Sequence, residues 1–299
     1  MIKTLDQILE TVKSKTKKRI IVVYANDEHT IEAISNAVNK GLVDATLVGD
    51  KDVILDICDT LEINPDKFFI VDVKNDVLAA EKAVKLITSG QGDIIMKGTI
   101  STDKYLKAIL NKEYGLVPPK GLLAHITITQ TPNYHKLLIV SDVAIIPNPD
   151  LKQKITIVNY LIKIAHKLGI EQPKVALIAA TEQITEALPS TIDAAIIAQM
   201  AQRGQVKEAI IDGPMGLDLA IDMDSVKIKK FNSPVAGDAD CILFPNIEAG
   251  NVFYKTNSKL AKGLSGAIVA GAKVPIVLTS RGDSPLTKMY SIAFGALLA

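Results

Sequence analysis

The chain has 299 residues, of which 48% are hydrophobic and 22% are charged, and its formal net charge is +1. This length allows two domains or one large α/β domain, and the near-neutral charge predicts no electrostatic attraction to nucleic acid or to an anionic membrane. Aromatic residues make up only 4% of the chain and tryptophan is absent, so we expect no stacking platform for bases.

The two cysteines, Cys58 and Cys241, are distant in sequence and lie in apolar segments. We expect both to be reduced core residues, which suits a cytoplasmic protein. No apolar run is long enough to span a bilayer, and no basic-then-apolar leader opens the chain. Residues 1–10 instead predict an amphipathic helix, whose apolar face carries Leu5, Ile8, Leu9 and Val12.

From residue 19 the chain alternates between strand, turn and helix. Residues 20–24 form a continuous apolar run, which is typical of a parallel strand covered on both faces. The alternation predicts a parallel, doubly wound α/β sheet. Further strands are expected at residues 45–48, 68–71 and 93–97, and helices at residues 27–40, 53–61, 76–88 and 102–110.

Lys97-Gly98-Thr99, followed by Ser101 and Thr102, lies at the end of a strand and the start of a helix, where such sheets bind ligands. Glycine permits close backbone approach, while hydroxyls and a lysine suit phosphate oxygens. The segment is not a Walker A motif, because GxxxxGK[ST] is absent. Helix capping alone would also account for a serine or threonine here.

Residues 114–121 have the proline and glycine content of a crossing between domains. Two β-rich runs follow at residues 122–131 and 136–146, and residues 132–135 between them predict a hairpin. We expect this antiparallel element at the edge of a second domain. His125 lies in the first run, and we assign it no catalytic role.

Helical and strand patterns alternate again after the hairpin, and a carboxylate cluster follows them. Asp218, Asp222 and Asp224 lack the EF-hand spacing and have no histidine nearby, so we expect capping or solvated carboxylates and no metal site. The expected helices are residues 152–168, 189–203 and 215–220, and the expected strands are 175–179 and 209–212, with a loop opening at residues 212–214.

Residues 233–255 combine a loop, a strand and a helix. The small residues at 233–237 are expected to leave backbone N–H groups accessible, and an apolar strand at 241–244 is stopped by a proline. A helix is expected after residues 250–251. A strand that ends in a polar turn before a helix favours an anionic ligand, although an ordinary βα connection has the same pattern. The candidate binding residues are Ser233, Pro234, Val235, Gly237, Asn246, Gly250, Asn251, Tyr254 and Lys255.

The last expected strand, residues 275–279, ends at Ser280-Arg281-Gly282-Asp283. Ser284 and Pro285 are suited to the N-cap and first position of a closing helix over residues 286–298. An arginine beside a helix N-terminus makes a focused anion pocket, because its planar fork matches phosphate. The alternative is a salt bridge between Arg281 and Asp283.

The segment SPVAGDAD, followed by FPN, GN and YK, resembles the signature of the phosphate acetyltransferase and phosphate butyryltransferase family. These enzymes exchange an acyl group between coenzyme A and inorganic phosphate. The resemblance covers nearly the whole chain. MKG at residues 96–98 and SRGDSPLTKMYSIAFGAL at residues 280–297 resemble the butyryltransferase branch more than the acetyltransferase branch.

The resemblance implies two doubly wound α/β domains with mostly parallel sheets and a cleft between them, as in isocitrate and isopropylmalate dehydrogenases. The first domain would comprise residues 1–121 and 280–299, and the second residues 122–279. Arg281 would hold phosphate, and Ser280 would help position the thiol or the acyl group. No cofactor or catalytic metal is implied, the substrates would be acyl-CoA and phosphate, and the protein would be a homodimer or a larger homo-oligomer.

One position departs from the family's pattern. Many phosphate acetyltransferases have an aspartate, proposed as the base for the coenzyme A thiol, where this chain has Thr287. Threonine cannot be that base, so the thiol would be activated by Asp283, by Lys288 or by the electrostatic field of the pocket.

We therefore expect a phosphate acyltransferase that moves a short-chain, butyryl-like group directly between coenzyme A and phosphate. The alternatives are an acetyl-CoA enzyme of the same family, a metal-dependent dehydrogenase of related fold, and a ligand-binding module without catalysis. An acyl-enzyme intermediate is not expected, because Ser280 has no histidine partner in its motif and Cys241 lies in an apolar strand.

Overall fold

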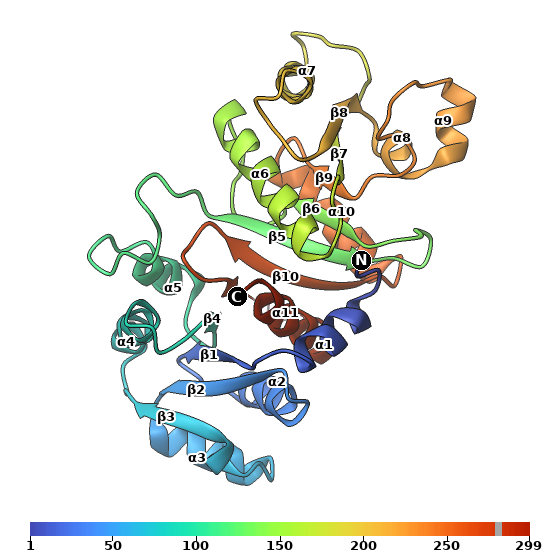
Figure 1. Cartoon of the computed structure of the whole chain (residues 1–299). Helices are drawn as coiled ribbons and strands as arrows, with labels where there is room; N and C mark the ends of the chain where they lie inside the picture. Colours follow the sequence, from blue (N-terminus) through green and yellow to red (C-terminus); the bar gives the residue numbers. More distant parts are fainter. Residues whose placement is uncertain (279–282) are drawn as a thin grey trace. The chain divides into compact units, whose positions relative to one another are not determined.

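The computed structural model describes residues 1–278 and 283–299, which divide into two compact units. Figure 1 shows that each unit consists of a sheet with helices packed against it. We call Asp6–Leu123 with Gly266–Ala299 the amino-terminal unit, and Ala124–Ser265 with Met1–Leu5 the central unit. The predicted α/β fold with mostly parallel strand pairing is confirmed.

In the amino-terminal unit the strand order is β3-β2-β1-β4-β11-β10. All neighbours pair in parallel except β10, which is antiparallel to β11. The strands are β1 (Lys18–Val23), β2 (Val43–Gly49), β3 (Phe68–Asp72), β4 (Ile94–Lys97), β10 (Leu264–Ala270) and β11 (Ile276–Val277). The helices are α1 (Leu5–Lys13), α2 (Glu28–Asn39), α3 (Lys51–Thr60), α4 (Asp76–Thr88), α5 (Thr102–Ile109) and α11 (Pro285–Leu298), with a 3₁₀ turn at Pro65–Lys67.

The core of this unit is built around β1. Residues 20–23 are at most 1% exposed, and Ile20 lies opposite Ala45 on one side and Ile94 on the other. The prediction of a parallel strand covered on both faces is confirmed. The apolar face predicted for the first helix is buried as well, which includes Leu5 and Val12.

In the central unit the strand order is β5-β6-β9-β7-β8. The predicted hairpin is confirmed, because β5 and β6 are antiparallel with Thr127 opposite Val140, and the remaining pairs are parallel. The strands are β5 (Ala124–Gln130), β6 (Leu138–Ser141), β7 (Lys174–Ile178), β8 (Ile210–Met215) and β9 (Cys241–Leu243). The helices are α6 (Leu151–Lys167), α7 (Pro189–Gln202), α8 (Leu217–Ile221), α9 (Met223–Lys229) and α10 (Ile247–Lys259).

Four elements differ from expectation. β8 continues to Met215 where we expected a loop, because a register shift lets that residue pair with Ile178. α10 begins directly after Asn246, so residues 250–251 lie inside the helix and not before it. β10 and α9 were not predicted.

The units also differ from the predicted domains at the second crossing. We expected the chain to return to the first domain at residue 280, whereas the division lies between Ser265 and Gly266. The reason is strand pairing: β11 pairs with β4 through Ile276 and Ile95, and β10 pairs with β11.

Both cysteines, Cys58 and Cys241, are free and buried, as predicted. Within residues 1–278 and 283–299, none of the helices combines the length and the apolar character that crossing a membrane requires.

Candidate functional site

The loop after β4 lies tightly against the end of β1. The Gly98 N–H donates to the Val23 carbonyl at 2.9 Å, and the Thr99 N–H donates to the Tyr24 carbonyl at 2.9 Å. A Cβ atom on Gly98 would lie 2.5 Å from the Tyr24 oxygen and 2.7 Å from the Val23 oxygen, so a larger residue would displace the loop. The predicted close backbone approach therefore exists, but toward β1.

Thr99 connects this loop to the start of α2. Its hydroxyl donates to Asp27 Oδ2 at 2.5 Å, and Asp27 Oδ1 caps α2 by accepting from the Thr30 N–H at 3.0 Å. Lys97 Nζ donates to the Gly98 carbonyl at 3.1 Å. Three of the residues predicted for phosphate binding are thus held in one place by main-chain and side-chain hydrogen bonds.

Asp27 is a residue that sequence analysis missed. Burial by itself would raise the pKa of Asp27, but hydrogen bonds from Thr30 and Thr99 outweigh burial and lower that pKa. The positive charge of Lys288 lowers it further. The side chain is therefore an ionised carboxylate at neutral pH. An aspartate before a helix predicts an N-cap, which gives no indication of a second partner 72 residues away.

Ser101 and Thr102 lie at the start of α5. Ser101 is the N-cap, and its hydroxyl accepts from the Lys104 N–H at 3.4 Å. Both side chains are exposed. The capping explanation for Ser101 is confirmed, and exposure leaves both hydroxyls accessible to a ligand.

In the central unit, two N–H groups of the loop at residues 233–237 are bonded within the protein and are not accessible as we expected. The Val235 N–H donates to Ser233 Oγ at 3.2 Å, and the Gly237 N–H donates to the Leu219 carbonyl at 2.8 Å. Gly237 has φ +71°, which turns the chain back against α8. Val235 is fully buried and Pro234 is exposed.

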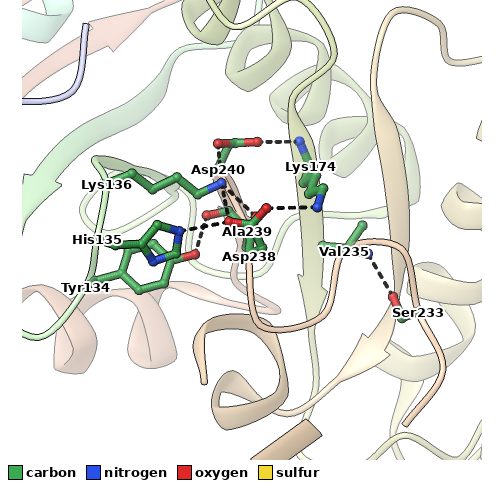
Figure 2. A network of polar contacts seen from close by, with 9 residues as sticks. All are labelled: Tyr134, His135, Lys136, Lys174, Ser233, Val235, Asp238, Ala239 and Asp240. Carbon is green, nitrogen blue, oxygen red and sulfur yellow. Dashed lines mark hydrogen bonds and ion pairs between the residues drawn. The ribbon is translucent and has the colours of Figure 1, made fainter. Parts of the chain in front are cut away.

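Directly after this loop, Asp238 and Asp240 are paired with two lysines (Figure 2). Lys136 Nζ lies 2.8 Å from a carboxylate oxygen of each aspartate, and Lys174 Nζ lies 2.8 Å from Asp238 Oδ2. The Lys174 N–H donates to Asp240 Oδ2 at 2.8 Å. His135 contacts Asp238 at 2.9 Å while its side chain remains 61% exposed.

These contacts fasten the 233–237 loop to the β5–β6 connection and to β7. Burial alone would raise the pKa of Asp238, but hydrogen bonds from Lys136, Lys174 and His135 hold that pKa well below its usual range. Tyr134 adds a hydrogen bond from its hydroxyl to the Ala239 carbonyl at 2.8 Å (Figure 2). The acidic end of the SPVAGDAD motif therefore has a structural role.

The polar residues at the start of α10 also make local contacts. Asn246 caps the helix by accepting from the Ala249 N–H at 3.0 Å, and Asn251 Nδ2 donates to the Val143 carbonyl at 3.0 Å. A Cβ atom on Gly250 would collide with the Asp142 carbonyl oxygen. Asn246, Gly250 and Asn251 therefore fix α10 against the segment that follows β6.

Tyr254 and Val235 belong to one hydrophobic cluster, Val235 at its buried centre and Tyr254 partly buried against it. The structure thus brings the 233–237 loop and α10 together, as the motif order predicts. The Lys255 ammonium lies 5.1 Å from the centroid of the Tyr254 ring, and Lys255 is exposed.

Ser280 and Arg281 lie outside the described residues. Asp283 is described, and it precedes the N-cap of α11, which is Ser284: the Ser284 hydroxyl accepts from the Thr287 N–H at 3.1 Å. The predicted cap and the first-position Pro285 are confirmed. Asp283 is therefore not the cap of this helix.

The carboxylates of the α8–α9 region behave as predicted. Asp222 caps α9, accepting from the Ser225 N–H at 2.9 Å, while Asp218 pairs with Lys229 at 2.8 Å. In residues 1–278 and 283–299, no three histidine, cysteine or acidic residues are grouped as a metal site would require.

The chain matches the family model described as phosphate acetyl/butaryl transferase over residues 3–81 and 73–296. It is 44% identical over 299 residues to phosphate butyryltransferase of Clostridium acetobutylicum, covering 100% of this chain and 99% of the relative. It is 38% identical over 295 residues to phosphate acetyltransferase of Thermotoga maritima, covering 99% of each.

Solved structures show the same relationship. A branched-chain phosphotransacylase from Enterococcus faecalis V583 superposes with a TM-score of 0.84 at 28% identity, covering 94% of this chain and 98% of that one. A 4-hydroxythreonine-4-phosphate dehydrogenase from Burkholderia phymatum superposes with a TM-score of 0.57 at 13% identity, covering 95% and 99%. The second likeness shows a shared fold alone.

The paired aspartates predict a stability effect for Lys136→Met. The Lys136 and Asp240 side chains are 18% and 8% exposed, and removing one partner of a buried pair leaves an uncompensated charge. We expect a loss of about 3 kcal/mol in the free energy of unfolding, measured by urea denaturation. Lys227→Met, which removes an exposed pair with Asp224, should cause no measurable loss.

The same variant should change the pH dependence. Because the pKa of Asp238 is lowered in the folded state, its stabilising contribution is present above its ordinary value of about 4 and is lost as pH falls below it. Unfolding free energy should therefore fall more steeply below pH 4 in the natural protein than in Lys136→Met. Parallel curves would contradict the assigned role.

Proposed function

The chain belongs to the phosphate acetyl/butyryl transferase family, and we propose that it moves a butyryl-like group reversibly between coenzyme A and inorganic phosphate. Acyl transfer between these two carriers is the activity of the family. The observation that carries the choice of a butyryl-like group is the 44% identity, over the whole chain, to a phosphate butyryltransferase. Acetyl transfer is the second candidate, because a phosphate acetyltransferase is 38% identical over nearly the same length.

The transfer we propose is direct. A phosphate oxygen attacks the thioester carbonyl carbon, the carbon–sulfur bond breaks, and coenzyme A leaves as a thiolate that takes up a proton. Such a reaction needs cations around phosphate and N–H donors facing the carbonyl oxygen. Burial raises the pKa of Cys241 well above its usual value and that of Cys58 less strongly, which supports a mechanism without a cysteine acyl-enzyme.

We assign phosphate binding to Arg281 and Lys97, with Ser280 positioning the thiol or acyl group. The hydrogen bonds that hold the loop after β4 support a fixed anion site at that strand end. In the central unit, we propose that exposed Pro234 and Lys255 contact coenzyme A. We propose that the other candidate residues of this region shape the surface around Pro234 and Lys255, because they make hydrogen bonds and apolar contacts within the protein. These residues are Ser233, Val235, Gly237, Asn246, Gly250, Asn251 and Tyr254.

We further propose that the enzyme works in the cytoplasm as a homodimer or a larger homo-oligomer, without a cofactor or catalytic metal. Two buried free thiols support a reducing compartment. Exposed apolar side chains on α7 and on the segment before it support a contact with a second copy of the chain. Ile184 is 64% exposed, Ile196 39% and Leu188 38%.

The function is tested by incubating the protein with butyryl-CoA and phosphate while free thiol is followed. We expect phosphate-dependent thiol release that is unchanged by EDTA, and kcat/KM about 10-fold higher for butyryl-CoA than for acetyl-CoA. The reverse preference would favour acetyl transfer. No thiol release, with a metal-dependent reduction of nicotinamide in its place, would favour the dehydrogenase alternative.

Arg281→Ala should lower kcat/KM for phosphate about 100-fold or more, because it removes a charge-assisted bidentate contact. The melting temperature should stay within about 2 °C of the natural protein. Arg281→Lys should restore part of the loss, since it keeps the charge but not the planar fork. Near-normal kinetics for Arg281→Ala would place the phosphate site elsewhere.

Asp283→Asn separates catalysis from stability, because Ser284 caps α11 and Asp283 does not. If Asp283 is the base for the thiol, the rate with acyl phosphate and coenzyme A should fall about 100-fold and the acidic limb of the pH–rate profile should disappear. The melting temperature should not change. Full activity would leave the thiol to Lys288 or to the field of the pocket.

A further inference from the structure

Lys288 is a buried lysine for which no bound partner has been described above. It lies in the first turn of α11 and is only 9% exposed. Among residues 1–278 and 283–299, no hydrogen bond or salt bridge from its ammonium is found, and Ser141 Oγ is the one fully buried side-chain polar atom without a partner, so the Lys288 ammonium still reaches solvent. Removing an ammonium from water is costly unless an acceptor replaces the lost hydration. A buried lysine that keeps its donors available is therefore suited to an anionic ligand.

The carboxylate of Asp27 balances the charge of Lys288 without occupying its donors. Asp27 Oδ1 accepts from the Thr30 N–H at 3.0 Å, and Oδ2 accepts from the Thr99 hydroxyl at 2.5 Å. The charge of Lys288 lowers the pKa of Asp27, and the helices that carry or follow these residues, α11 and α2, are in contact. The ammonium is thus held near a carboxylate whose two oxygens already have partners.

The sheet places these residues at one edge. Asp27 follows β1, Thr99 follows β4, and α11 follows β11, and these three strands are parallel neighbours. The carboxyl ends of parallel neighbours meet at the same edge, where ligands bind in such folds. α2 and α11 pack against each other. Their N-terminal N–H groups add positive partial charge to this edge.

We propose that Lys288 donates hydrogen bonds to a phosphate oxygen of the substrate, and that Asp27 and Thr99 are positioning residues for this lysine and for the loop after β4. The inference rests on the proposed phosphate acyltransferase function. In this proposal Lys288 acts as a hydrogen-bond donor to phosphate and not as the base for the thiol. It neutralises the phosphate while a phosphate oxygen attacks the thioester, and holds the acyl phosphate in the reverse reaction.

Lys288→Met tests the proposal, since methionine fills a similar volume without the charge. We expect the KM for phosphate to rise about 10- to 100-fold, as for the loss of a charge-assisted hydrogen bond, while the KM for butyryl-CoA stays within about twofold. Lys288→Arg should recover most of the affinity because it keeps a cation. Should Lys288→Met fold poorly, Lys288→Gln and Lys288→Arg compare a neutral with a charged side chain at the same position.

Lys154→Met is the matched control in the central unit. Lys154 is 6% exposed and its ammonium lies 2.6 Å from Asp193, so the variant also removes a buried ammonium. It should lower the melting temperature and leave the KM for phosphate unchanged. A merely structural Lys288 would behave in the same way, and that result would overturn the proposal.

Asp27→Asn tests the positioning role, because asparagine also caps a helix but carries no charge. We expect a smaller rise in the KM for phosphate than for Lys288→Met, and no further rise when both changes are combined. Independent, additive effects would contradict the coupling. If Lys288→Met affects the KM for coenzyme A in the reverse reaction and not that for phosphate, the lysine serves the thiol and the proposal fails.

These outcomes distinguish two failures. Thiol release by the natural protein with an unchanged phosphate KM in Lys288→Met would overturn this inference and leave the proposed function intact. No thiol release by the natural protein would overturn the proposed function itself.

Discussion

Parallel pairing of β1 with β2 on one side and β4 on the other is the constraint on which the amino-terminal unit depends. Ile20 to Val23 are buried on both faces, so a shift in register would cost apolar burial along the whole strand. Parallel pairing also gathers the carboxyl ends of β1, β4 and β11 at one edge. Asp27, Thr99 and Lys288 come from distant parts of the chain, and they are neighbours because their strands are.

In the central unit, ion pairs fix the position of a loop, as strand pairing fixes the residues at the edge of the sheet in the amino-terminal unit. The 233–237 loop has little secondary structure to hold it, and its position depends on Asp238 and Asp240, which are paired with Lys136 and Lys174. A motif that resembles a ligand-binding signature thus combines residues that present a surface with residues that fix it. In this chain Pro234, Asn251 and Lys255 are exposed candidate residues of the motif, whereas the carboxylates of Asp238 and Asp240 are bonded within the protein.

Local patterns in the sequence predicted what depends on neighbouring residues. The apolar run at residues 20–24, the helix over 76–88 and the Ser284-Pro285 start of α11 follow from burial, periodicity and capping, and all three are present. Contacts across long separations gave no such signal. Lys136 and Asp238 are 102 residues apart, and neither has a neighbour in the sequence that indicates the pair.

The errors have the same origin. Gly250 suggested a turn before α10, because glycine weakens an isolated helix, but tertiary packing overrides that preference. A side chain at this position would meet the Asp142 carbonyl, so glycine is required inside the helix by a partner that local sequence does not reveal. Likewise, the small residues at 233–237 suggested accessible N–H groups, whereas Leu219 and Ser233 provide acceptors for them.

Charge at the carboxyl edge of the amino-terminal unit connects these observations to the chemistry. Thr287 stands where an aspartate would sit beside Lys288, so the first turn of α11 holds a cation without an adjacent carboxylate on that turn. The charge of Lys288 acts on Asp27, and both oxygens of Asp27 have donors, from α2 and from the loop after β4. Asp27 balances the charge of Lys288, so the N–H groups at the N-termini of α2 and α11 are the remaining source of positive partial charge at this edge. An anionic phosphate suits such N–H donors and an ammonium, and these features agree with the proposal that phosphate binds here.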